Sequence, residues 1–305
     1  MTAQDAAPGT AVEQVLAHQS RQLDGAALRD TQAFTREFLQ RVPPEEVAAR
    51  SAAEWAALVQ SILDFARGRE PGVAKVRVFN GTGAATGEPA RTTVEVVTDD
   101  MPFLVDSVGM AIVDAGLRVH TVIHPVCRIE RDASGQLQSL ASLDDANRSG
   151  AESIMHFEVD RVIDAGGLED IRQRIASALG DVREAVGDWQ AMRQRMLATA
   201  DELPVRPMPV DAAGVAEAQD FLRWAADDNF TFLGYREYAV VETAGDELLQ
   251  AVEGSGLGIL RGTERSLAPR SLRTLVAKEL PQSGSMDAII LTKTSPSAGA
   301  VSWKS

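Results

Sequence analysis

Residues 94–116 read VEVVTDDMPFLVDSVGMAIVDAG. The alternating β-branched start is typical of a strand. The acidic pair Asp99-Asp100 and then Pro102 predict that this strand turns directly into a helix, because proline is tolerated at the first helical position. Apolar residues then recur at helical spacing, and Gly116 is a typical helix end. The stretch therefore predicts a strand–turn–helix unit in which an acidic residue caps the helix.

Strand-like and helix-like patterns continue on both sides of this unit. A short alternating run precedes it, and residues 117–131 form a long predicted strand in which Pro125 indicates an edge or a bulge. Residues 136–150 are polar and are expected to form a loop, whereas residues 154–162 read as another strand. Residues 168–196 carry the apolar stripe of a long helix. The order strand, strand, helix, strand, strand, helix predicts a small α+β sandwich.

Three further regions flank this sandwich. Residues 1–70 carry helical apolar stripes, and Ser51 with Glu54 forms a capping box, so we expect an N-terminal helical arm. Residues 201–212 contain several prolines that prevent a continuous helix, which indicates a linker. Residues 213–305 are strand-rich at first and become small and polar near the end, so we expect an incomplete domain.

The composition limits the class of protein. The chain has 305 residues, and at ~150 residues per domain about two domains are expected. Its formal net charge of −14 disfavours binding to phosphate backbones. The single cysteine fits a reducing compartment, and no apolar run approaches the ~18 residues that a membrane span needs. We therefore expect a cytoplasmic protein that binds neither nucleic acid nor a membrane.

Few residues suggest catalysis or metal binding. His120, His124 and Cys127 are possible ligands by type, but residues four apart on a strand lie ~13 Å apart, too far to share one zinc ion. The glycines of residues 254–262 miss the dinucleotide-binding spacing by one residue and indicate a turn in a sheet. Nucleophile-elbow, phosphate-loop and metalloprotease patterns are absent from the sequence. We therefore predict no catalytic, cofactor-binding or metal-binding residue in this chain.

The turn at residues 99–105 is the strongest candidate for a binding site. Free N–H groups at a helix start can receive a carboxylate ligand, and residues 101–103 would form an apolar wall beside it. The alternative is that Asp99 or Asp100 only caps the helix. The residues alone favour the cap.

Four ordered motifs resemble those of one family. They are DDMPFLVDSV at 99–108 followed by VIHPV at 122–126, ESIMHFE at 152–158, NFTFLGYREY at 229–238 and GSGLGILRG at 254–262. Together they look like the signature of the large, NAD-specific bacterial glutamate dehydrogenases. The chain resembles the N-terminal part of these enzymes, and the first seventy residues add little to the resemblance.

This resemblance implies a fold and a function. It implies an ACT-like βαββα sandwich over residues 71–200, including its long C-terminal helix, and the start of a PAS-like domain over residues 213–305. The full enzymes of the family oxidise L-glutamate to 2-oxoglutarate and ammonia with NAD, and they self-associate as homo-oligomers. The family's dinucleotide-binding core and its catalytic lysine and aspartate have no counterpart here. This chain is therefore expected to hold no cofactor and to be inactive alone.

The resemblance ends before the chain does. After Lys293 the family pattern is lost within a few residues, and residues 294–305 are small and polar. A split or frameshifted reading frame would produce this pattern. We therefore expect a truncated regulatory fragment whose last domain is incomplete.

The resemblance also implies an effector site, because in related domains the strand–helix turn and the helix start bind an amino acid. The residues expected to line that site are Asp99, Asp100, Met101, Pro102, Phe103, Leu104, Val105 and Gly116. Two alternatives to a regulatory fragment remain. One is a stand-alone amino-acid-sensing module, and the other is a structural module that packs against sister subunits.

Overall fold

The computed structural model describes residues 8–81, 90–142, 149–205, 211–243, 246–262 and 270–271. The chain divides into two compact units, Met1–Gly180 and Asp181–Ser305, which are described separately. Within the described residues, no helix has both the length and the apolar character that crossing a bilayer requires.

The first unit begins with the predicted helical arm. Its helices are α1 (Pro8–Gln19), α2 (Gly25–Gln40), α3 (Pro44–Ala49) and α4 (Ala52–Ala66). The capping box at the start of α4 is confirmed, because Ser51 Oγ accepts a hydrogen bond from Glu54 N and Glu54 Oε2 accepts one from Ser51 N. Pro44 occupies the first turn of α3, where its missing N–H costs nothing.

An antiparallel sheet follows the arm. Its strands are β1 (Lys75–Asn80), β2 (Thr92–Asp99), β3 (Val119–Ile123), β4 (Val126–Arg131), β5 (Leu137–Ser142) and β6 (Ala151–Val159). They lie in the order β1-β2-β6-β4-β5, and β3 pairs with β6 beside β4. Helix α5 (Leu104–Asp114) connects β2 to β3, and α6 (Ala165–Glu202) follows β6. The predicted α+β class, with a helical arm before the sandwich, is confirmed.

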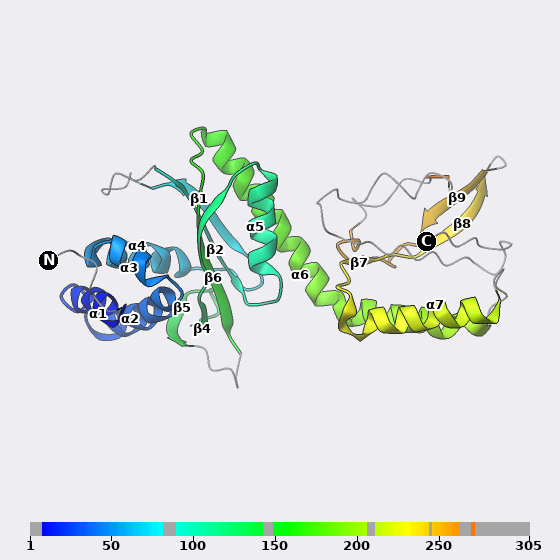
Figure 1. Cartoon of the computed structure of the whole chain (residues 1–305), viewed down its shortest axis with the longest axis horizontal. Helices are drawn as coiled ribbons and strands as arrows, with labels where there is room; N and C mark the ends of the chain where they lie inside the picture. The colour runs from blue at the N-terminus through cyan, green and yellow to red at the C-terminus, as the bar shows by residue number, and fades with distance from the viewer. Residues whose placement is uncertain are drawn as a thin grey trace. The chain divides into compact units, whose positions relative to one another are not determined.

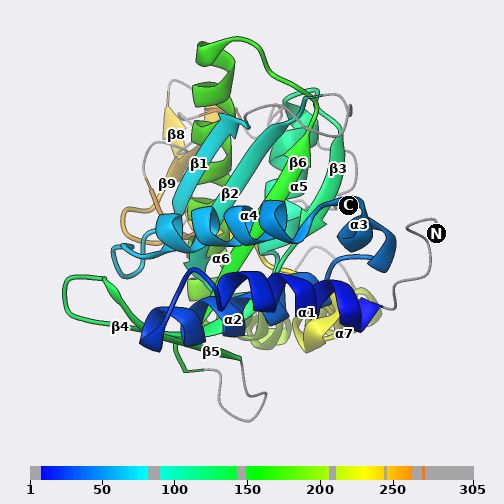
Figure 2. The same ribbon diagram turned by 90° about the vertical axis from the view of Figure 1, so that its left-hand side faces the viewer.

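Helices cover both faces of this sheet (Figures 1 and 2). Because side chains alternate along a strand, Val97 and its partner Ile154 point to the arm, where they join one core with Phe38, Trp55 and Ile62. On the opposite face the strand residues, α5 and the start of α6 are buried in a second layer. The buried apolar residues of that layer include Val94, Val96, Leu104, Val108, Ile112, Met155, Phe157, Ile171 and Ile175.

Two details of the sheet differ from the predictions. The long strand expected over residues 117–131 is two strands, because the chain breaks at His124-Pro125, where proline cannot donate a ladder hydrogen bond. The polar stretch expected to be a loop contains β5, which pairs with β4 and buries Leu140. The polar side chains of β5 obscured its strand character.

The second unit contains the rest of α6, a 3-10 turn (Leu203–Val205), α7 (Ala212–Trp224) and a π-helical turn (Ala225–Asn229). Its strands are β7 (Gly234–Tyr235), β8 (Tyr238–Thr243), β9 (Asp246–Ala251), β10 (Leu257–Gly258) and β11 (Arg270–Ser271). The predicted turn in a sheet at the glycine-rich motif is confirmed, since β10 pairs with β7. Gly258 has φ +57, and a Cβ there would lie 2.2 Å from Leu233 O.

Several predictions fall outside the described residues. They concern part of the proline-rich linker, at 206–210, and the part of the expected incomplete domain that follows residue 271. The PAS-like identity of residues 213–305 therefore stays a prediction.

We predict that the arm and the sheet unfold as one unit. The Phe38 side chain is fully buried between Phe34, Trp55 and His156. Phe38→Ala should therefore lower the free energy of unfolding by about 3–5 kcal/mol. Urea unfolding followed by circular dichroism measures the change. The exposed Val113→Ala variant is the control and should change it by less than about 0.5 kcal/mol. A loss below about 1 kcal/mol for Phe38→Ala would contradict the shared core.

Candidate functional site

The turn between β2 and α5 differs in detail from the prediction. Helix α5 begins at Leu104, and its N-cap is Phe103, which has φ +70 and makes no side-chain capping hydrogen bond. The expectations that Pro102 opens the helix and that an acidic residue caps it are therefore wrong. The reason is that the sheet continues further than expected. Asp99 still pairs with Glu152 across the ladder, and Asp100 N donates to Ala151 O at 2.9 Å.

The two carboxylates at this turn lie on opposite faces of the sheet. Asp99 Oδ1 accepts a hydrogen bond of 2.5 Å from the guanidinium of Arg69, on the arm side. Asp100 Oδ1 accepts one of 2.6 Å from Ser153 Oγ, on the side of α5. Successive strand residues point to alternate faces, so two adjacent acids contact two different layers.

His124 extends the contact of Asp100. Its Nε2 lies 3.0 Å from Ser153 Oγ. Because that hydroxyl has one proton and donates it to Asp100, His124 Nε2–H must be the donor to Ser153. Burial lowers the pKa of His124, so its imidazole is the neutral form near neutral pH. A hydrolytic triad needs the histidine between the serine and the acid, and here the serine is in the middle, so these three residues do not activate a nucleophile.

The structure brings together only some of the predicted effector residues. Residues 99–103 and Val105 line one turn, and the Phe103 side chain is 49% exposed there. Leu104 is buried in the core, where its side chain cannot contact a ligand. Gly116 lies just after the other end of α5, about 16 Å away at 1.5 Å per residue. Its φ of +80 serves the helix end, where Gly116 N donates to Val113 O.

On the arm side, Asp99, whose side chain is 37% exposed, lies at the edge of a buried ionic cluster that the sequence did not reveal. The Arg69 side chain is 3% exposed and donates to Glu152 Oε2 at 3.1 Å, to Asp99, and to Val73 O at 3.2 Å. Arg69 follows α4, so the cluster joins the candidate turn to the end of the arm. The sequence could have indicated this cluster only if the strand register that pairs Asp99 with Glu152 had been known.

Arg131 completes this cluster from β4. It donates to both Glu152 oxygens at 2.6 and 2.8 Å, and to the carbonyls of Ala66 and Arg67 at 3.0 and 3.1 Å. Those carbonyls belong to the C-terminal end of α4, whose partial negative charge attracts a cation. The arginine therefore fixes the end of the arm helix to the sheet.

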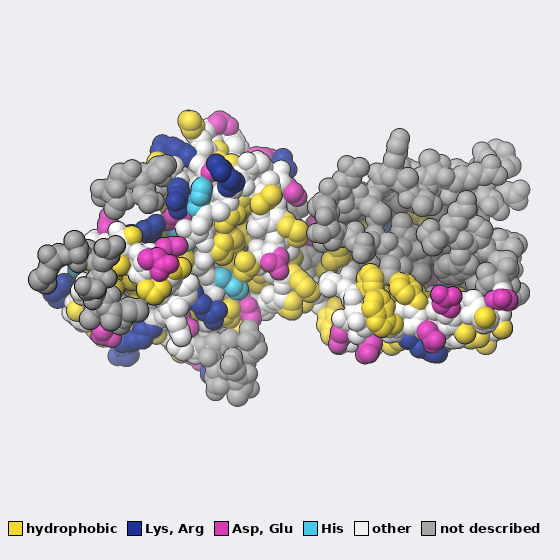
Figure 3. Space-filling view, viewed as in Figure 1, with side chains coloured by type: hydrophobic (Ala, Val, Ile, Leu, Met, Phe, Trp, Pro, Cys, Tyr) yellow, Lys and Arg dark blue, Asp and Glu magenta, His cyan; other side chains and the backbone are white. Residues whose placement is uncertain are grey.

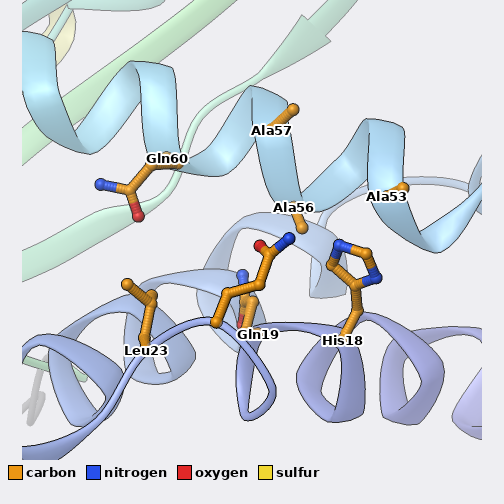
Figure 4. A pocket seen from close by; sticks show the side chains of 8 residues that line it. His18, Gln19, Leu23, Ala53, Ala56, Ala57 and Gln60 are labelled. Carbon is orange, nitrogen blue, oxygen red and sulfur yellow. The ribbon is translucent and has the colours of Figure 1, made fainter.

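A shallow groove of about 400 Å³ lies between α1 and α4 (Figure 4). Alanines and Gln60 of α4 line one side of it, and residues of α1 and of the turn after it, among them His18 and Gln19, line the other. Neither carboxylates nor lysine or arginine side chains line it, so it offers no charged partner for an amino acid. The groove is therefore a weaker candidate than the turn.

The histidines and the cysteine of residues 120–127 do not form a metal site. His120 Nε2 contacts Asp160 Oδ1 at 2.7 Å at the surface, whereas Cys127 is buried on the arm side. Burial raises the pKa of Cys127 to about 12, so the thiol is protonated and a poor ligand. Among the described residues, the side chains of histidine, cysteine and acids form no group that could hold a metal ion.

Charges are mixed on the described surface that Figure 3 shows. Basic and acidic side chains are interspersed on this face of the first unit. A broad basic surface, which a phosphate backbone would need, is not formed by the described residues in that view.

The comparison with protein families defines the class of this fold. Residues 34–175 match the family described as the ACT1 domain of glutamate dehydrogenase. The match extends from α2 through the complete sheet to the first part of α6. Over these residues, somewhat less than half of the chain, the sequence is similar to the ACT1 domain of glutamate dehydrogenase.

Individual relatives agree with this assignment. The chain is 38% identical over 241 residues to the NAD-specific glutamate dehydrogenase of Halomonas elongata, covering 78% of this chain and 15% of that enzyme. It is 30% identical over 244 residues to the NAD-specific glutamate dehydrogenase of Pseudomonas aeruginosa, and this match covers 79% of this chain and 15% of that enzyme. It is 28% identical over 203 residues to the enzyme of Mycobacterium tuberculosis, and this match covers 64% of this chain and 12% of that enzyme. The resemblance seen in the motifs is confirmed, and the chain spans about 15% of the length of the first two relatives.

We predict that the Arg69 cluster contributes strongly to stability. Arg69→Gln leaves Asp99 without this guanidinium and Glu152 with one arginine in place of two. Removing one partner of a buried ion pair costs about 3 kcal/mol or more, and urea unfolding measures it. The matched control is Arg67→Gln, whose exposed pair with Asp64 is worth less than about 1 kcal/mol. If both substitutions lowered the free energy of unfolding equally, burial of the cluster would not contribute to stability, and the prediction would be wrong.

Proposed function

We propose that this chain is the N-terminal regulatory and structural region of an NAD-dependent glutamate dehydrogenase. In the full enzyme, L-glutamate would be oxidised to 2-oxoglutarate and ammonia with NAD as the hydride acceptor. The observation that carries the proposal is the ACT1 match over residues 34–175, within a chain similar to NAD-specific glutamate dehydrogenases along most of its length. NAD and the catalytic groups would belong to polypeptide outside the region that this chain resembles.

In this proposal each region of the chain has its own role. Residues 1–70 are the helical arm, residues 71–200 are the ACT-like domain, and residues 213–305 begin a PAS-like domain after the linker at 201–212. The arm covers one face of the sheet, which supports a structural role for it. Self-association of the full enzyme as a homo-oligomer is part of the proposal.

The proposed regulatory site is the turn at residues 99–105. The first turn of α5 has no side-chain cap, so its N–H groups suit the α-carboxylate of an amino acid. The Asp100 carboxylate, on the same side of the sheet, suits the α-ammonium group. The exposed Phe103 ring offers an apolar surface beside both. An amino acid carries these two charges at fixed spacing, which makes it the ligand class that fits best.

The first test concerns catalysis. The purified 305-residue chain, mixed with L-glutamate and NAD, is expected to form no NADH, as followed by absorbance. A full-length relative such as the Halomonas elongata enzyme is the positive control. NADH formation that scales with the concentration of this chain would overturn the assignment as a regulatory region.

The second test concerns the effector. Each of the proteinogenic L-amino acids is added at millimolar concentration, and the thermal unfolding of the chain is measured. At a concentration 100-fold above Kd, a ligand should stabilise the fold by about 2.7 kcal/mol. Asp100→Asn should abolish this stabilisation because it removes the charge that attracts the ammonium group. Asp114→Asn, at the exposed far end of α5, is the control and should retain it.

Two results would contradict the effector site. One is that no L-amino acid raises the unfolding temperature of the wild-type chain. The other is stabilisation that persists unchanged in Asp100→Asn, which would place the ligand elsewhere. Comparing each variant without ligand separates a loss of binding from a loss of the Ser153 hydrogen bond.

A further inference from the structure

His156 is fully enclosed between the sheet and the helical arm. It lies in the middle of β6, is 1% exposed, and points to the arm face together with its partner Glu95 on β2. The Phe38 ring of α2 packs edge-on against the imidazole at a centroid distance of 6.0 Å. A titratable side chain is thus buried at the junction of the two layers.

Each ring nitrogen of His156 faces a carboxylate. Nδ1 lies 3.1 Å from Glu95 Oε1, and Nε2 lies 3.8 Å from Glu158 Oε1. The Nε2 atom is buried and has no hydrogen-bond partner in the described structure. The carboxylates approach from opposite sides of the ring, so one metal ion could not bridge all three groups, whereas an imidazolium carries an N–H toward each of them.

Arginines from the surrounding elements complete the cluster. Arg77 of β1 binds Glu95, and it also donates to Ser61 O of α4 at 3.0 Å. Arg50, between α3 and α4, binds Glu158 and lies 5.0 Å from the centre of the Trp55 ring. These arginines connect the carboxylates of the sheet to the arm helices.

Arg91, which precedes β2, donates to the other Glu158 oxygen at 3.0 Å. The side chains of Arg50, Arg77 and Arg91 are 35%, 30% and 29% exposed, so water partly screens their charges. His156 is the only group of the cluster that is wholly buried and can change its charge near neutral pH. Loss of its proton would leave the facing carboxylates without their buried cation.

We propose that His156 is a proton-sensitive joint that holds the helical arm on the sheet when the imidazole is protonated and loosens it when the proton is lost. The joint acts within the first unit and does not depend on the proposed effector site. It would make the position of the arm responsive to pH in any assembly that contains this domain.

The direction of the response follows from linkage. Burial alone lowers the pKa of His156, but the nearby negative carboxylates of Glu158 and Glu95 outweigh it and raise the pKa above 6.5. A folded-state pKa above the unfolded value gives stability that is complete below pH 6.5 and is lost as the pH rises through the folded-state pKa. Burial alone raises the pKa of Glu158, but the positive charges of His156 and Arg50 outweigh it and lower the pKa to about 2. This lies far below the pH range in which His156 titrates, so the Glu158 carboxylate stays charged there.

The experiment measures the proton and the arm separately in the full chain. Proton NMR follows the imidazole signals between about pH 6 and about pH 9, which is practical because the chain has only 4 histidines. Amide hydrogen exchange of α2 and α4, corrected for its intrinsic pH dependence, reports how firmly the arm is held. His156→Gln removes the titration, and His120→Gln is the control because His120 pairs with Asp160 at the surface.

In the wild-type chain and in His120→Gln, the His156 imidazole should titrate above pH 6.5. The protection of the arm should fall about tenfold for each unit by which the folded pKa exceeds the unfolded value. His156→Gln should show no such fall. An imidazole that titrates at or below 6.5, or an equal fall in His156→Gln, would overturn the proposal. If His156→Gln does not fold, the pKa of the His156 imidazole in the wild-type chain alone tests the proposal, by the same limit.

Discussion

Ion pairs buried between the sheet and the helical arm hold the first unit together. Glu95, Glu152 and Glu158 all point to the arm face of the sheet and are nearly excluded from water. Burying a carboxylate costs several kcal/mol unless it is paired and hydrogen-bonded. The guanidinium groups that pair with them come from the arm, from its ends and from neighbouring strands. The arm therefore cannot leave without exposing apolar core and breaking these pairs together.

The opposite face of the sheet, which packs against α5 and α6, buries mainly apolar side chains, and the candidate site lies at its edge. There the strands bury aliphatic side chains against α5 and α6, and where β2 ends Ser153 donates a hydrogen bond to Asp100. Asp99 and Asp100 are adjacent in sequence but contact different layers. A ligand that moved the Asp100 side chain would also affect the adjacent residue Asp99. The Asp99 carboxylate is bound by Arg69 at the end of the arm. The candidate site and the arm thus share one short segment of backbone.

Local signals predicted much of this structure. The capping box at Ser51 and Glu54 marked the start of α4, and the apolar stripe after residue 168 marked α6, because helix periodicity and caps depend on neighbouring residues. The predictions failed where partners are distant in sequence. The acids before α5 looked like helix caps, yet they bind Arg69 and Ser153, 30 and 53 residues away. The polar run before Gly150 gave no strand signal, although β5 forms there by pairing with β4.

The sequence by itself determined the α+β class, the helical arm, the sandwich and, through its motifs, the family. It did so because hydrophobic period, caps and prolines act over a few residues, and because motifs are read in order along the chain. Only the tertiary structure decided which carboxylates are buried, that Asp99 and Asp100 face different layers, and that His156 is enclosed by Glu95 and Glu158. These features depend on strand register, which pairs residues about sixty positions apart, and no local pattern specifies that pairing.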